Sequence, residues 1–223
     1  AIRRYRSGAT MYLDARTRRN LELTSTLSDE GTSKGTLFAV IDDTITPMGA
    51  RLLKSWMLNP LIDPEEIRER HGGVQELFDH PDLLREIREI LSGIHDVERL
   101  IGRVCLERAN PRDMLSLAES LEQSGKLREA AAQCNSGIMK RCGERIEDLR
   151  NLALYISGAL VENPPATVTE GGIFRDGYMA ELDELRSISR SGRRWIADYQ
   201  ARERQRSGIA NLKIGYNNVF GYY

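Results

Sequence analysis

The chain has 223 residues, of which 40% are hydrophobic and 29% charged, and its formal net charge at pH 7 is −1. This length allows a sizeable hydrophobic core in one large or two modest domains, and the balanced charge favours no class of partner. No apolar run approaches the length of a membrane span, and no signal peptide is evident. The three cysteines are scattered and lack nearby histidines, so we expect no disulfide framework, no metal site and a cytoplasmic location. Because no apolar run could span a membrane, we also expect no membrane partner.

Proline marks the start of most predicted helices. Pro47, Pro64, Pro81 and Pro111 stand where first-turn residues sit, a position at which the missing N–H costs no hydrogen bond. Three of them follow a Thr, Asp or Asn that can cap the helix. Together with apolar residues at helical spacing, this pattern predicts helices at 36–42, 47–58, 64–78, 81–92, 96–108 and 111–123.

The same periodicity predicts one long helix over residues 138–160, which ends before Asn163-Pro164-Pro165. In helix 47–58 we expect a packed apolar side made of Met48, Leu52, Leu53 and Trp56. The fold class predicted for residues 1–162 is therefore all-α, a multi-helix core domain.

A connector rich in proline and glycine follows at 163–177, and residues 178–208 then form the second predicted region. Residues 178–207 are predicted to form one helix, about 45 Å long at 1.5 Å per residue. Its apolar residues gather on one side, and arginines gather opposite, which indicates a strut with one docking face and one solvent face. Trp195 and Met179, like Trp56, are interpreted as core.

The last region, 209–223, changes character. Its β-branched and aromatic residues predict a short β-strand at the C-terminal end. We expect this strand to have no partner within the chain. Because a lone strand leaves its backbone groups unpaired, the natural protein is expected to continue past Tyr223.

No pattern in the chain indicates catalysis. His71, His80 and His95 lie in separate helical segments, and the glycine pairs match no phosphate-binding motif. We therefore predict no catalytic, cofactor-binding or metal-binding residue, and interpret the arginines of helix 178–207 as a solvent-exposed face. If the chain contacts DNA, the better candidates are on the terminal strand: Lys213, Asn217 and Asn218.

Five stretches, in order, resemble the core region of MutS, the DNA mismatch repair ATPase family. They are LDARTRRNLELT (13–24), TLFAVIDDTITPMGARLLKSWMLNPLID (36–63), DVERLIGRV with RANPRDM (96–114), GGIFRDGYMAELDELR (171–186) and RERQRSGIANLKIGYNNVFGYY (202–223). The resemblance implies a core domain, a lever helix over 178–208 and the first strand of a DNA-contacting clamp domain.

The resemblance also implies what lies outside these residues: a mismatch-reading domain, a returning lever helix and an ATPase that binds ATP and Mg²⁺. The implied partners are double-stranded DNA, a second MutS subunit and a MutL-type protein, in a bacterial cytoplasm near the nucleoid. This chain alone is expected to need no cofactor and to hydrolyse nothing. It would link the clamp to the ATPase and transmit conformational change.

Two alternatives stay open at this point. A helical adaptor could bind protein partners through its long helix and never meet DNA. A MutS relative could act on recombination intermediates instead of mismatches. The reading frame on either side of the chain would discriminate between them.

Overall fold

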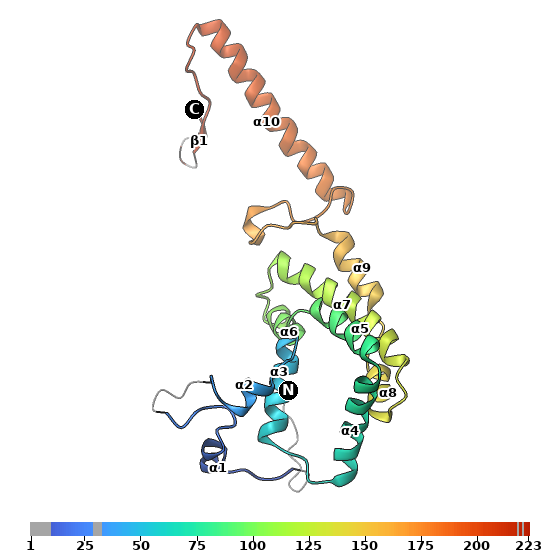
Figure 1. The fold of residues 1–223 in the computed structure, drawn as a ribbon. Helices are drawn as coiled ribbons and strands as arrows, with labels where there is room; N and C mark the ends of the chain where they lie inside the picture. Colours follow the sequence, from blue (N-terminus) through green and yellow to red (C-terminus); the bar gives the residue numbers. More distant parts are fainter. Residues whose placement is uncertain (1–9, 29–32, 218, 220) are drawn as a thin grey trace. The chain divides into compact units, whose positions relative to one another are not determined.

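The computed structural model describes residues 10–28, 33–217, 219 and 221–223 (Figure 1). The chain divides into two compact units, the first ending at Ile173 and the second spanning Phe174–Tyr223. The predicted fold class is confirmed: the described elements are helices, apart from one small β-hairpin near the C-terminus. The division falls inside the predicted connector, and the bounds of the four predicted regions stay a prediction.

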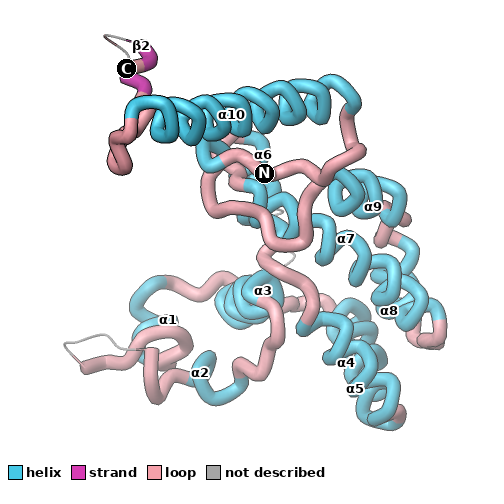
Figure 2. Tube along the Cα trace, turned by 90° about the horizontal axis from the view of Figure 1, so that it is seen from above, coloured by secondary structure: helices cyan, strands magenta, loops and turns pink. Residues whose placement is uncertain are grey.

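The first unit is a set of helices arranged around α7. Figures 1 and 2 show α7, α8 and α9 side by side, with α1 and α2 apart from them. Helices α5, α6, α8 and α9 pack on α7, and α4 packs on α5 and α8. The elements are α1 (Ala15–Asn20), α2 (Leu37–Ile41), α3 (Pro47–Leu58), α4 (Pro64–Asp79), α5 (Pro81–Ser92), α6 (Val97–Cys105), α7 (Pro111–Ala132), α8 (Gly137–Glu144), α9 (Arg150–Ala159) and the 3₁₀ turn η1 (Val168–Glu170).

The hydrophobic core lies where α6 and α9 meet α7. Fully burying a leucine or isoleucine side chain contributes about 1.5–3 kcal/mol, so these contacts hold the first unit together. The buried cluster consists of Leu100, Leu117, Ala118, Leu121, Ala153, Ile156 and Leu160.

Proline positions predicted the helix starts correctly, since α3, α4, α5 and α7 each have proline in the first turn. The side chain of Thr46 accepts a hydrogen bond from the Gly49 N–H at 3.1 Å. At α7, Asn110 and Asp113 form a reciprocal capping box. The Asp14 side chain caps α1 by accepting a hydrogen bond from the Thr17 N–H. This cap is a sequence signal for α1, a helix that was not predicted.

The predicted single helix over 138–160 is wrong, because the structure has two helices, α8 and α9, separated by residues 145–149. In the break, the carboxylate of Asp148 accepts from the Arg150 N–H at 3.1 Å and from the Arg150 guanidinium at 2.6 Å. A side chain that binds nearby backbone offers the chain an alternative to helical bonding. Periodicity continues across the break and therefore did not reveal it.

Helices α6 and α7 differ from prediction at their C-terminal ends. Helix α6 stops at Cys105, short of residue 108, and Glu107 adopts a positive φ of 55° beyond it. Helix α7 continues past residue 123 to Ala132. Gly125 does not end it, because Gly125 is buried where an added Cβ would lie 3.4 Å from the Arg150 side chain.

Three large apolar residues that were predicted to be core are exposed. Trp56 is 39% exposed with the Arg70 guanidinium 3.8 Å from its ring centre, Trp195 is 60% exposed and Met179 is 50% exposed. The expectation of a packed α3 is also wrong, since α3 buries none of its residues and Leu52 is exposed. Helical spacing assigns residues to one face, but a neighbouring element must then cover that face.

The second unit contains α10 (Ala180–Ser207) and a hairpin of β1 (Tyr216–Asn217) and β2 (Gly221–Tyr222). The expectation that the terminal strand has no partner within the chain is wrong. Strand β1 pairs antiparallel with β2, which places Tyr216 opposite Tyr222. Gly221 has a φ of 71°, a conformation that glycine adopts without a Cβ clash. Gly215 and Tyr223 exchange backbone hydrogen bonds of 2.9 Å in both directions and extend the hairpin.

A polar contact links α3 to the helical bundle. The Arg51 guanidinium donates to both oxygens of Asp96, the N-cap of α6, at 2.8 Å, and to Glu98 at 2.6 Å. These hydrogen bonds from Arg51 lower the pKa of the Asp96 carboxyl below its usual value.

Replacing Arg51 by glutamine should destabilise the first unit slightly at pH 7, because the pair is partly exposed. The folded-state pKa of Asp96 is lowered, so this stabilisation exists above the ordinary carboxyl pKa of about 4 and is lost as pH falls. Urea unfolding at pH 7 and pH 3 should therefore show the larger difference between variant and original chain at the higher pH. Arg99→Gln, which removes a more exposed partner of Asp96, is the control and should change less; equal effects would contradict the assignment.

Candidate functional site

The start of α10 is fastened to the segment before it by one arginine. The Arg186 guanidinium donates to the Phe174 carbonyl and to the Asp176 carboxylate, each at 2.9 Å. The Gly177 N–H donates to the Asp183 carboxylate at 2.8 Å, and the rings of Phe174 and Tyr178 stack with centres 5.7 Å apart. Only 20% of the Arg186 side chain is exposed, so this residue holds the preceding segment against the start of α10.

The other end of α10 is fastened to the hairpin. Gly208 closes the helix in the left-handed conformation, with a φ of 70°. The segment after it runs back beside the last turns, where Arg204 Nε donates to the Leu212 carbonyl at 2.7 Å. The Ile214 N–H donates to Gln200 Oε1 at 2.9 Å. The direction of the hairpin is therefore set by side chains of the helix.

Only some of the arginines predicted to form a solvent-exposed face of α10 are in fact solvent-exposed. Arg190 is 73% exposed, in agreement with the prediction. Arg186 and Arg204 instead bind backbone carbonyls, so both side chains serve the fold of this unit. Sequence reasoning missed both roles, although Asp183 three residues before Arg186 is a signal for a local ion pair.

The predicted DNA-contacting residues lie on the hairpin and the segment leading to it. Lys213 is exposed just before β1. Asn217 is half-buried at the end of β1, where its side-chain oxygen accepts from the Val219 N–H at 3.0 Å. Asn218 lies outside the described residues. Their contact with DNA stays a prediction, and Asn217 has a role in the turn itself.

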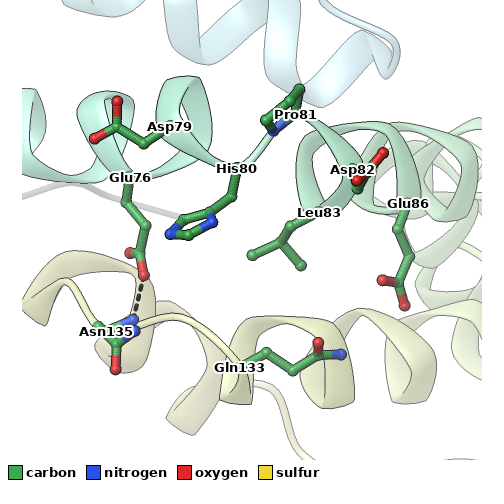
Figure 3. A pocket seen from close by; sticks show the side chains of 9 residues that line it. All are labelled: Glu76, Asp79, His80, Pro81, Asp82, Leu83, Glu86, Gln133 and Asn135. Atoms are coloured by element: carbon green, nitrogen blue, oxygen red, sulfur yellow. Dashed lines mark hydrogen bonds between the residues drawn. The ribbon is translucent and has the colours of Figure 1, made fainter.

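The first unit contains an acidic hollow of about 470 Å³ between the α4–α5 junction and the end of α7 (Figure 3). Glu76 points at the α7–α8 loop and accepts from the backbone N–H groups of Asn135 and Ser136. Hydrogen bonds from Ser136 and Asn135 lower the pKa of Glu76. The ring of His80 lies between this carboxylate and Leu83. These contacts join α4 to the α7–α8 loop and set up no reaction.

Other chemistry finds little support in the part of the chain that the structure describes. There, no group of three His, Cys, Asp or Glu side chains is arranged to hold a metal ion. The described helices include none that is long and apolar enough to cross a membrane. The described residues form a helical unit and a long helix held by hydrogen bonds at both ends.

The sequence comparisons assign this architecture to a class of protein, the helical domains of DNA mismatch repair proteins. Residues 16–212 match the family model described as MutS domain III. DNA mismatch repair protein MutS of Symbiobacterium thermophilum is 47% identical over 98% of this chain, and that of Halothermothrix orenii is 46% identical over 96%. The protein of the same name from Methanothrix thermoacetophila is 42% identical over the whole chain.

The chain belongs to the MutS family. It covers 25%, 24% and 26% of these three relatives, so it spans about a quarter of the length of the curated relatives it matches. The described structure corresponds to their domain III, and whatever the remaining three quarters contribute lies outside it.

Replacing Arg186 by methionine should free residues 174–178 from α10. We expect the Gly177 amide to exchange its hydrogen about fivefold faster, because a typical hydrogen bond contributes a net free energy of about 1 kcal/mol. Hydrogen exchange read by mass spectrometry or NMR measures this. Arg190→Met is the matched control, because Arg190 has only a 3.7 Å contact with Asp176. Equally faster hydrogen exchange in both variants would show that Arg186 does not hold this segment against α10.

Proposed function

We propose that this chain is the core and lever region of a DNA mismatch repair protein, and that α10 transmits conformational change between a DNA-holding clamp and a distant ATPase. The observation that carries the proposal is the geometry of α10. It is one unbroken helix of 28 residues, about 42 Å long, and each end is tied to its neighbouring segment by hydrogen bonds. A stiff rod of this kind moves both ends together.

The proposed role divides the work between this chain and the rest of the protein. ATP and Mg²⁺ would bind in an ATPase part outside these residues, and this chain would supply no catalytic group. Double-stranded DNA with a mismatch would be held partly by the clamp that begins at the hairpin. A second subunit of the same protein and a MutL-type protein are the proposed protein partners, in the cytoplasm. The names of the relatives favour mismatch repair over a role in recombination.

A kink in α10 should uncouple the two ends. The experiment uses the Symbiobacterium thermophilum relative with its corresponding residues replaced by this chain. Ala197→Pro removes a backbone hydrogen bond in mid-helix, at a cost of about 3 kcal/mol, and bends the rod. We expect basal ATP hydrolysis and DNA binding to persist within about twofold, while stimulation of hydrolysis or nucleotide exchange by mismatched DNA falls at least about tenfold, a loss of about 1.4 kcal/mol of coupling.

The control is Ala197→Gln, which keeps the helix and adds only an exposed side chain. It should behave like the unmodified chimera. If the proline variant keeps full stimulation by mismatched DNA, α10 is not the transmitting element.

The isolated chain should bind duplex DNA weakly and without preference for a mismatch. Affinity should fall with salt with a shallow slope, because few phosphate contacts are available. Replacing Lys213 by alanine should reduce the slope of log K against log salt by about 1, whereas Lys126→Ala, an exposed lysine of the first unit, should not. Fluorescence anisotropy with matched and mismatched duplexes measures both quantities. Tight, mismatch-selective binding by the isolated chain would contradict the division of work proposed above.

A further inference from the structure

The sequence contains one Asp-Gly pair, Asp176 and Gly177, shortly before the start of α10, and it contains no Asn-Gly pair. The side-chain carboxyl of an aspartate can form a five-membered ring with the backbone nitrogen of the next residue. Glycine in that next position favours the reaction, because it has no Cβ to shield the nitrogen and its backbone rotates freely. The sequence therefore places a reactive peptide bond next to the long helix.

The structure holds both reacting groups of this pair in hydrogen bonds. The Gly177 N–H, which supplies the attacking nitrogen, donates to the Asp183 carboxylate at 2.8 Å. The Asp176 carboxylate, which supplies the carbon that is attacked, accepts from the Arg186 guanidinium at 2.9 Å. An amide must lose its proton in this attack, and a charge-assisted hydrogen bond to a carboxylate opposes that loss.

The backbone of the pair is also restrained. The Tyr178 N–H donates to the Arg175 carbonyl at 3.4 Å, so Asp176 and Gly177 are the two central residues of a β-turn. Gly177 has a φ of 84°, which suits the second central position of a type II turn. Burial in the described residues adds no protection, since 72% of the Asp176 side chain is exposed. Hydrogen bonds are therefore what restrain this pair.

We propose that Asp176-Gly177 is a site of spontaneous isomerisation to isoaspartate, and that Asp183 and Arg186 suppress the reaction by holding its two reacting groups. The Gly177 nitrogen forms a bond to Cγ of Asp176, and one carboxyl oxygen leaves as water with the amide proton and the carboxyl proton. A second water molecule then opens the cyclic imide. Opening at one carbonyl restores aspartate, and opening at the other leaves the main chain running through the Asp176 side chain, with no change in mass.

The isomerised chain could not keep the contacts at the start of α10. An isoaspartyl linkage adds one carbon atom to the main chain inside the turn. A lengthened turn cannot maintain the hydrogen bonds to Asp183 and Arg186 and the stacking of Phe174 on Tyr178 in their present geometry. Asp183 and Arg186 therefore protect the segment that they hold. The proposal does not rest on the transmitting role of α10.

The first experiment needs no variant. The 223-residue chain is kept for several weeks at neutral pH, once folded in buffer and once unfolded in guanidinium chloride. A protease that cuts before aspartate but not before isoaspartate, followed by mass spectrometry, measures the isomerised fraction at residue 176. We expect the reaction to be at least about tenfold slower in the folded chain, because two hydrogen bonds oppose it there.

The second experiment removes one hydrogen bond at a time from the folded chain. Asp183→Ala frees the Gly177 N–H and should speed isomerisation about fivefold, the factor expected for one hydrogen bond. Glu184→Ala, which removes the neighbouring exposed carboxylate, is the matched control and should react like the original chain. Arg186→Met should also speed the reaction, and Arg190→Met, which removes only a 3.7 Å contact with the same carboxylate, should change it less.

Hydrogen exchange at Gly177 separates this protection from a general loss of stability. Both exchange and isomerisation require the Gly177 N–H to leave its hydrogen bond, so the two rates should rise by the same factor in Asp183→Ala. Amides in the middle of α10 should exchange as before. Equal isomerisation in the folded and unfolded chains, no isoaspartate in the unfolded chain, or an Asp183→Ala variant that reacts no faster than Glu184→Ala would each overturn the proposal.

Discussion

Helix α10 is held by hydrogen bonds at both of its ends, and the described residues provide no core along its length. Its described side chains are all at least partly exposed. Arg186 binds the segment before the helix, and Arg204 and Gln200 bind the segment after it. Helices in water gain most of their stability from packing of an apolar face. A 28-residue helix without such packing depends on its ends and on whatever covers its apolar side.

The first unit follows the opposite principle. Its helices are held by close contacts between small residues around α7. A Cβ on Gly143 would lie 2.9 Å from the Ala131 Cβ, and one on Gly73 would lie 2.6 Å from the Ile138 side chain. Such contacts leave no room for larger side chains and fix α8 against both α7 and α4. The first unit is therefore closely packed, whereas α10 is a long helix without a buried residue among those described.

The family assignment and the proposed transmitting role rest on different observations. Membership of the MutS family follows from the match over residues 16–212 and from relatives more than 40% identical over nearly the whole chain. The transmitting role is our proposal, and its support is that α10 is a long helix held by hydrogen bonds at both ends.

The sequence by itself determined the features that depend on neighbouring residues. Proline in the first turn and a capping Thr, Asp or Asn located the starts of α3, α4 and α7, and the order of five motifs identified the family. The tertiary structure alone decided which faces are covered: Trp56 and Trp195 have helical spacing like core residues, yet none of the described elements buries them. It also decided the break between α8 and α9 and the pairing of β1 with β2. Capping is a contact within one turn of the chain, whereas burial and strand pairing need atoms from segments that the local pattern does not specify.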